Sequence, residues 1–155
     1  MCLDGIYRVV LFGHRDFDGH TILEERLYRL LKDLIKTKAF VEIYVGRNGE
    51  FDVYSASVVK RVQKEIGQEN SSITLVLPYR VADLEYYEKY YDSVMIPESL
   101  VSTYPKAAIS KRNRWMVEIA DLVICYVQRE DGGAYTAMKY AERLGKEIIN
   151  FATRK

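Results

Sequence analysis

The sequence predicts a single α/β domain over residues 1–155, a Rossmann-like, doubly wound fold with a mainly parallel sheet of about five strands. Short apolar segments alternate with amphipathic segments along the whole chain, and three of the four loops that follow the main apolar segments contain glycine. Strands separated by helices pair in parallel, because the crossovers are right-handed and cover both faces of the sheet. A chain of 155 residues also fits one such domain.

The first half of the chain carries three predicted strands and two predicted helices. The strands cover 7–12, 41–45 and 73–77, each a short apolar run bounded by turn residues. The first helix begins near Thr21, since Thr21 and Glu24 have the spacing of a capping box. Its leucines recur at three and four residues, as in a helix that lies on a core. The second helix covers about 52–66.

The second half carries the remaining two strands. Residues 79–104 show the weakest pattern, with a tyrosine-rich helix inside 83–92 and a short apolar run at 94–96 that is not counted as a strand. A helix at 106–119 then precedes the strand 122–127. Gly132 and Gly133 open the last helix, Gly145 is its predicted carboxyl cap, and 148–151 is the last strand.

The charge balance limits the partners that we expect. Lys and Arg total 23 and Asp and Glu total 22, so the formal net charge is +1. A protein that coats nucleic acid needs a concentrated positive field to displace counterions from phosphates. We therefore expect no nucleic acid partner, whereas a local basic pocket for one small anion is compatible with this composition.

The sequence shows no pattern for a metal, a cofactor or a membrane. His14 and His20 are the only histidines and have no cysteine pair near them, which argues against a metal site. No dinucleotide fingerprint follows the first strand, so no cofactor is expected. Cys2 and Cys125 do not make a disulfide framework, and Cys125 reads as a small buried hydrophobe. The run at 9–12 is too short for a signal or membrane helix, which predicts a cytoplasmic protein with no membrane partner.

Doubly wound sheets bind ligands outside the carboxyl ends of their strands, so the loops there hold the candidate site. Gly13, His14 and Arg15 follow the first strand. Gly13 lets backbone amides approach a ligand, and Arg15 offers a bidentate contact to a phosphate or carboxylate. The alternative is a tight turn with a solvated arginine.

Gly49, Glu50 and Asp52 follow the second strand. The glycine permits a close turn. Asp52 either caps the next helix or accepts hydrogen bonds from ribose hydroxyls. Glu50 has no capping role and is the better candidate for contact with a sugar.

Two later segments offer contacts to an anion. Arg112 lies close to Arg114 in a basic segment of the chain. On a helix these side chains point in different directions, so only some of them can contact one ligand. The alternative is that the segment is a solvated helix face. Gly132 and Gly133 leave helix amides exposed for a phosphate, and Thr136 adds a hydroxyl. From the sequence, replacing Arg112 with alanine weakens binding of a phosphorylated ligand by about 1.5–3 kcal/mol and leaves the fold intact.

Four tyrosines lie at helical spacing in the segment 83–92: Tyr86, Tyr87, Tyr90 and Tyr91. Such a stripe packs on the domain or on another subunit, or forms a lid that stacks on a nucleobase. The acidic residues around it argue against nucleic acid there. We expect a homo-oligomer, for which this stripe offers a surface.

The segments 112–117, 120–124 and 132–136, together with 13–15 and 49–52, resemble the SLOG superfamily (SMF/DprA–LOG), and are most similar to its YpsA-like branch. The resemblance implies a Rossmann-like fold that binds nucleotides or nucleotide-derived signals. Some members are enzymes, including cytokinin-activating phosphoribohydrolases, and others are sensors or DNA-processing proteins.

The resemblance also carries implications for single residues. It places Arg112 where the enzymes keep an arginine that works at the ribose phosphate, and 132–136 on their phosphate loop. Met138 and Lys139 stand where that motif continues to a catalytic glutamate. Without this carboxylate, the oxocarbenium-like charge of N-glycosidic cleavage loses a stabilising group. The resemblance therefore favours binding over turnover.

These observations favour a cytoplasmic binding protein, a sensor or sequestering module for a nucleotide or a nucleotide-derived ligand such as an ADP-ribose-like molecule. Glu50 and Asp52 would face its ribose. The phosphate would be held by the loop glycines Gly132 and Gly133 and by the side chains of Arg15, Arg112 and Thr136. The alternative is a nucleotide N-glycosidase that uses Glu50 as a relocated catalytic carboxylate. A third reading is a subunit that docks partners through its tyrosine stripe.

Overall fold

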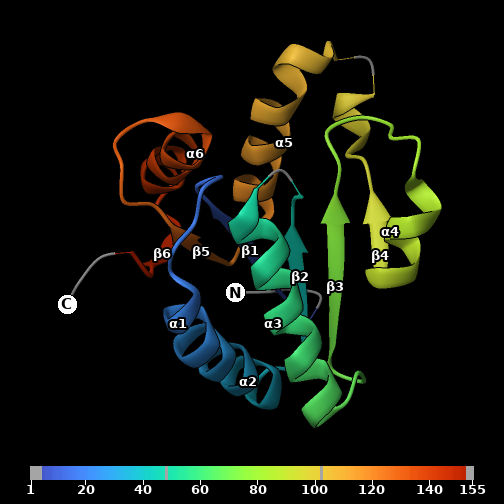
Figure 1. Cartoon of the computed structure of the whole chain (residues 1–155), viewed down its shortest axis with the longest axis vertical. Helices are drawn as coiled ribbons and strands as arrows, with labels where there is room; N and C mark the ends of the chain where they lie inside the picture. Colours follow the sequence, from blue (N-terminus) through green and yellow to red (C-terminus); the bar gives the residue numbers. More distant parts are fainter. Residues whose placement is uncertain (1–4, 48, 102, 153–155) are drawn as a thin grey trace.

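The computed structural model describes residues 5–47, 49–101 and 103–152 (Figure 1). Six strands form one parallel sheet in the order β4-β3-β2-β1-β5-β6. The strands are β1 (Ile6–Gly13), β2 (Phe40–Val45), β3 (Ser71–Val76), β4 (Ser93–Met95), β5 (Leu122–Tyr126) and β6 (Glu147–Asn150). The helical elements are α1 (His20–Ile22), the π-helical turn η1 (Leu23–Leu27), α2 (Tyr28–Thr37), α3 (Glu50–Ile66), α4 (Leu84–Tyr90), the 3-10 turn η2 (Glu98–Leu100), α5 (Pro105–Ile119) and α6 (Gly132–Arg143).

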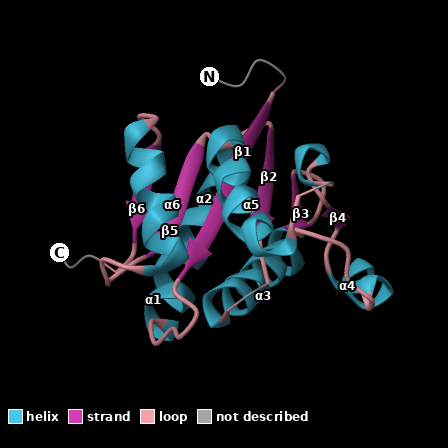
Figure 2. Cartoon of the chain, turned by 90° about the horizontal axis from the view of Figure 1, so that it is seen from above, coloured by secondary structure: helices cyan, strands magenta, loops and turns pink. Residues whose placement is uncertain are grey.

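Helices cover both faces of this sheet. Alternate residues of a strand point to opposite faces, so β1 places Val9 and Leu11 in one core layer and Val10 and Phe12 in the other. The first layer packs against α2 and α3, and α3 crosses the front of the sheet in Figure 1. The second layer packs against α5 and α6, which lie side by side in Figure 2. This arrangement confirms the predicted α/β, Rossmann-like fold with a parallel sheet.

The sheet has one strand more than the sequence predicts. The apolar run at 94–96 forms the edge strand β4, which pairs in parallel with β3 from Thr74 opposite Ser93 to Val76 opposite Met95. Only three residues take part, and such a run is too short for a periodicity of two to show. The pairing is set by the neighbouring strand and by α4, so the local sequence does not reveal it.

The predicted capping box at the start of the first helix is wrong. The helix begins at His20, its N-cap is Gly19, and no side chain caps it. Thr21 therefore lies inside the first turn. Gly19 is buried, and a Cβ at this position would run into the ring of Tyr126. Only glycine fits this close contact, and glycine has no side chain that could cap the helix.

Cys125 lies in β5 and is fully buried, and burial raises the pKa of its thiol to about 12. It is a core residue, as the sequence predicts, whereas Cys2 lies outside the described residues. Within 5–47, 49–101 and 103–152, no helix is both long and apolar enough to cross a membrane. In the same ranges no three His, Cys, Asp or Glu side chains gather as metal ligands would.

The strand order places a topological switch at β1, because β1 lies between β2 and β5 while the chain winds away to either side of it. The loops after β1 and β5 therefore separate and leave a crevice above the sheet at this point. The arrows of β2, β3 and β4 point upward in Figure 1, so the carboxyl ends of these strands lie at their upper ends in this view. Residues that follow β1, β2 and β5 meet at this rim.

Candidate functional site

A small pocket of about 210 Å³ lies at the switch point, and we call it the inner pocket. Six residues that the sequence singles out as candidates line it: Gly13, Arg15, Gly49, Asp52, Arg112 and Gly133. They come from the loops after β1 and β2, from α3, from α5 and from the start of α6. The structure therefore brings together residues that lie up to 120 positions apart in the chain.

Arg112 is the cation at the base of this pocket. Its side chain is only 3% exposed. Nη1 donates to the carbonyl of Val76 at the end of β3 (2.9 Å), and Nε donates to Oδ1 of Asn113 (2.9 Å). Burial lowers the pKa of Arg112 below its ordinary value, Asp52 raises it and Arg47 lowers it. The result is a buried positive charge that an anion in the pocket would stabilise further.

Asp52 is the carboxylate of the inner pocket, and it does not cap α3. The N-cap is Gly49, so Asp52 lies inside the first turn, where a negative charge suits the positive end of the helix. The capping role predicted for Asp52 is therefore wrong. Asp52 is buried beside Arg112, and Gly46 makes room for both side chains. A Cβ at Gly46 would lie 3.0 Å from Arg112 Nη1 and 3.0 Å from Asp52 Oδ2.

Two helices begin at the inner pocket. Gly49 precedes α3, and Gly133 and Ala134 belong to the first turn of α6. Neither helix has a side-chain cap, and the first turn of α6 carries no acidic residue. Gly132 adopts a φ of 90°, which side-chain-bearing residues rarely take. The first turn of α3 already carries Glu50 and Asp52, so the amino end of α6 is the one that adds positive potential beside Arg112 without an acidic residue of its own.

Gly13 and Gly49 allow close packing of the rim. A Cβ on Gly13 would lie 2.5 Å from Cγ of Phe51, so the space beside Gly13 is filled by a core ring. A Cβ on Gly49 would lie 2.7 Å from Cα of Arg15. The amide of Glu50 donates to the carbonyl of Arg15 (2.9 Å), which ties the two loops together. These two glycines allow neighbouring residues to pack closely around the pocket, and they do not leave free space for a ligand to approach the backbone.

His14 is a buried anchor for the loop after β5. Its Nε2 accepts hydrogen bonds from the amides of Gln128 (3.0 Å) and Arg129 (3.1 Å). An acceptor at Nε2 requires the neutral ring. Burial lowers the pKa of His14, Arg129 lowers it further, and Asp16 and Asp131 raise it. The structure therefore gives His14 a role in holding the loop that leads to Gly132, and it does not line the inner pocket.

A second, more open pocket of about 1000 Å³ adjoins the inner pocket, and we call it the outer pocket. It shares Arg15 and Gly49 with the inner pocket. Glu50 lines this outer pocket, and its Oε1 accepts a hydrogen bond from the amide of Phe17 (3.3 Å). Glu50 and Asp52 thus lie in different pockets, although the sequence assigns both to one ribose.

Sequence reasoning missed several residues of the outer pocket. Arg47 lines it and lies over the ring of Tyr87, 5.4 Å from the ring centroid. His20 and Tyr54 form an aromatic pair beside it, with ring centroids 4.5 Å apart. Arg47 directly follows Gly46 in a loop at the end of β2, so its place in the sequence could have identified it as a candidate. His20 and Tyr54 lie on helices and show no such signal.

Thr136 lies in a third cavity, a groove of about 420 Å³ between α5 and α6 that we call the α5–α6 groove. Its hydroxyl donates to the carbonyl of Gly132 (3.1 Å). Gly133 lines both this groove and the inner pocket. Met138 and Lys139 lie together in a cavity at the end of β5 and β6, away from the inner pocket. No carboxylate of α6 lines the inner pocket.

The tyrosines of α4 pack at the β4 edge of the molecule. Tyr91 is buried in the core, whereas Tyr86 is 70% exposed. Tyr87 is half-buried and carries Arg47 on its ring. None of the four tyrosines lines the inner pocket, the outer pocket or the α5–α6 groove. The lid over a nucleobase is therefore not seen, and self-association through this surface stays a prediction.

No protein-family model and no curated protein sequence matches the chain. Two solved structures share its fold. DNA processing protein A from Helicobacter pylori, described for a unique single-stranded DNA binding mode, matches over 94% of this chain and 65% of its own, at 15% identity and a TM-score of 0.65. DNA processing protein A (DprA) from Streptococcus pneumoniae matches over 92% of this chain and 49% of its own, at 13% identity and the same TM-score.

The chain thus spans about half to two thirds of the length of these structures. At such identities the likeness shows the fold. The fold that they share with this chain is the one that the sequence resemblance implies.

The expectation that excludes nucleic acid as a partner is wrong. The same fold occurs in two DNA-processing proteins, one of them described as binding single-stranded DNA. The expectation rests on the net charge of the whole chain, which does not report the charge of one surface. A net charge of +1 averages over the whole surface, whereas binding depends on the local field. Lys106, Arg114 and Arg143 gather in the α5–α6 groove, and a sum over the chain hides them.

Proposed function

We propose that this protein binds a nucleotide or a nucleotide-derived ligand at the rim of its sheet, with a phosphate in the inner pocket. The observation that carries the proposal is Arg112, a buried guanidinium placed where two uncapped helices begin. Buried charges are stabilised by partners of opposite sign, and helix amino ends favour phosphate. The proposal includes membership of the YpsA-like branch of the SLOG superfamily and a cytoplasmic role as a sensor or sequestering module.

The shape of the rim supports an orientation for the ligand. Arg15 and Gly49 line both the inner pocket and the outer pocket. The outer pocket offers the aromatic pair of His20 and Tyr54, together with Val53, which is 58% exposed. A base and sugar of an ADP-ribose-like molecule would lie there, because aromatic and apolar side chains suit a nucleobase. The phosphate would then point toward Arg112.

Arg15 offers the cleanest test of this proposal. Its side chain is exposed, and its backbone carbonyl accepts a hydrogen bond from the amide of Glu50. We expect Arg15→Gln to weaken binding of AMP and ADP-ribose about tenfold, since a charge-assisted hydrogen bond is lost. Titration calorimetry measures both affinities, with Arg29→Gln on α2 as a matched control for lost charge. No binding of either compound to the wild-type chain, or equal affinity of Arg15→Gln and the wild type, would contradict the proposal.

The second candidate function is a nucleotide N-glycosidase, and the position of Glu50 favours it. Glu50 is an exposed carboxylate in the outer pocket, next to Arg15 and Gly49, which border both pockets. A sugar held between the pockets would lie near this carboxylate. Incubation with AMP and NAD, followed by chromatography for released base, separates the two functions. Base release that Glu50→Gln abolishes supports the enzyme, and binding without release supports the sensor.

A further inference from the structure

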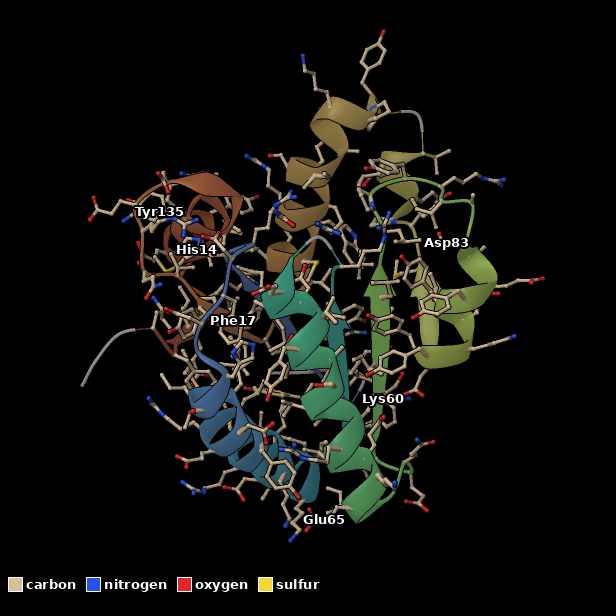
Figure 3. The ribbon with its side chains drawn as sticks, in the orientation of Figure 1. His14, Phe17, Lys60, Glu65, Asp83 and Tyr135 are labelled. Atoms are coloured by element: carbon tan, nitrogen blue, oxygen red, sulfur yellow. The ribbon has the colours of Figure 1, made fainter. Side chains whose placement is uncertain are left out.

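The α5–α6 groove is basic and aromatic. Lys106 and Arg114 of α5 and Lys139 and Arg143 of α6 line it, with Tyr135 and Tyr140 between them. Figure 3 shows Tyr135 on α6 at the upper end of the molecule, the same end as His14 and opposite to Glu65. No acidic side chain lines the groove. This is a local excess of positive charge on a chain whose formal net charge is only +1.

Three of the four cations in the groove form no ion pair within the described residues. Lys139 pairs with Glu142 (2.9 Å), next to it on the same helix. Lys106, Arg114 and Arg143 form no ion pair with any carboxylate in the described part of the chain. Uncompensated cations that face each other across a groove repel one another, so a bound anion would stabilise this arrangement.

The two arginines are held by an aromatic ring. The guanidinium carbon of Arg114 lies 4.4 Å from the ring centroid of Tyr140, and that of Arg143 lies 5.3 Å from it. The hydroxyl of Tyr140 donates to Glu118, which fixes the ring. A guanidinium packed on a ring keeps its N–H groups available at its edge, and these match the oxygens of a phosphoryl group.

The groove continues from the inner pocket. Ile109, Asn113 and Gly133 line both cavities. A ligand whose first phosphate lay at Arg112 would have only Asn113 and Gly133 between this phosphate and the groove that Arg114 lines. The outer pocket, the inner pocket and the α5–α6 groove are neighbours along the rim: Arg15 and Gly49 line the first two, and Asn113 and Gly133 line the last two.

We propose that the α5–α6 groove binds a second phosphoryl group of the ligand. The ligand class is then a nucleotide that carries a second phosphoryl group, and a free dinucleotide or a stretch of a single strand supplies this group beyond the next nucleoside. This inference rests on the proposed function, because it assigns the first phosphate to the inner pocket. It adds a second subsite, built by Arg114 and Arg143, that a mononucleotide leaves empty.

The test compares AMP with the linear dinucleotide pApA in titration calorimetry on the full chain. The wild type binds pApA about 10- to 100-fold more tightly than AMP, the gain expected for charged hydrogen bonds to one added phosphate. The double variant Arg114→Gln, Arg143→Gln loses this preference and keeps the wild-type affinity for AMP. The double variant Arg29→Gln, Lys36→Gln on α2 removes the same charge away from the rim and keeps both affinities.

Equal affinity of the wild type for AMP and pApA would overturn the inference, as would an unchanged preference in the Arg114/Arg143 double variant. Binding of neither compound would instead overturn the proposed function itself. A ten-nucleotide oligoadenylate distinguishes the two sources of the ligand. An affinity equal to that of pApA points to a free dinucleotide, a higher affinity points to a single strand, and both results support the second subsite. Thermal melting checks folding, because both arginines are on the surface of the groove and their loss shifts Tm by at most about 2 °C.

Discussion

The inner pocket and the α5–α6 groove both present arginine to the rim, but they hold it in different ways. Arg112 is buried and bonded to the carbonyl of Val76, so it belongs to the core as much as to the pocket. Arg114 and Arg143 rest on the ring of Tyr140 at the surface. Stability and ligand binding are therefore coupled in the inner pocket, whereas the groove allows a change in binding without a change in stability. Substitution of Arg112 tests this difference most directly.

The largest effect is expected for Arg112→Ala. The change removes the donor from Val76, leaves a cavity below the rim and takes the nearby cation from the buried Asp52. We expect the free energy of unfolding to fall by about 3–5 kcal/mol, as when one partner of a buried charged pair is removed. Urea denaturation measures this, with Arg114→Ala as the control for the groove. The sequence alone predicts an intact fold for Arg112→Ala, and a loss below about 0.5 kcal/mol would restore that view.

The next effect is expected for a methyl group added to two rim glycines. In Gly49→Ala the new Cβ lies 2.7 Å from Cα of Arg15, a backbone atom that cannot turn aside. We expect a loss of about 1–3 kcal/mol in the free energy of unfolding, the usual cost of overpacking. In Gly133→Ala the new Cβ meets only Nδ2 of Asn113 at 3.7 Å. That variant should be as stable as the wild type, or more stable by up to about 1 kcal/mol. Chemical denaturation of both variants side by side decides, and equal losses would show that the rim is packed no more tightly at Gly49 than at Gly133.

The smallest effect is expected for mild acid, through His14. Its pKa in the folded chain is below the ordinary 6.5, so the unfolded chain binds more protons between these two values. The free energy of unfolding should therefore stay constant above pH 6.5 and fall as the pH is lowered from 6.5 toward the folded-state pKa. His14→Gln keeps an acceptor for the amides of Gln128 and Arg129 without titrating at this pH. Its stability should fall less over the same range in parallel melts, and identical pH profiles would show that His14 does not control this loop.

The rim could be predicted from the sequence because its residues follow strand ends. Gly13, Gly49 and Gly133 each come soon after an apolar run or open a helix, and the rule for parallel sheets brings such loops to one edge. Packing could not be predicted in the same way. The ring of Phe51 that fills the space beside Gly13 belongs to another element. Burial of Arg112 depends on the end of β3, which lies 36 residues away in the chain. Such contacts leave no local pattern.

The two ends of the sheet restrict how copies of this chain can associate. The edge strand β4 has three residues and the opposite edge strand β6 has four. Edges this short offer few free backbone donors and acceptors to another strand, so the sheet does not favour continuation into a neighbouring molecule. A dimer of this protein would therefore bury helical surface, of which Leu84, Tyr86 and Tyr90 on α4 are the most apolar exposed part near β4. The short edges also protect the chain against aggregation through added strands.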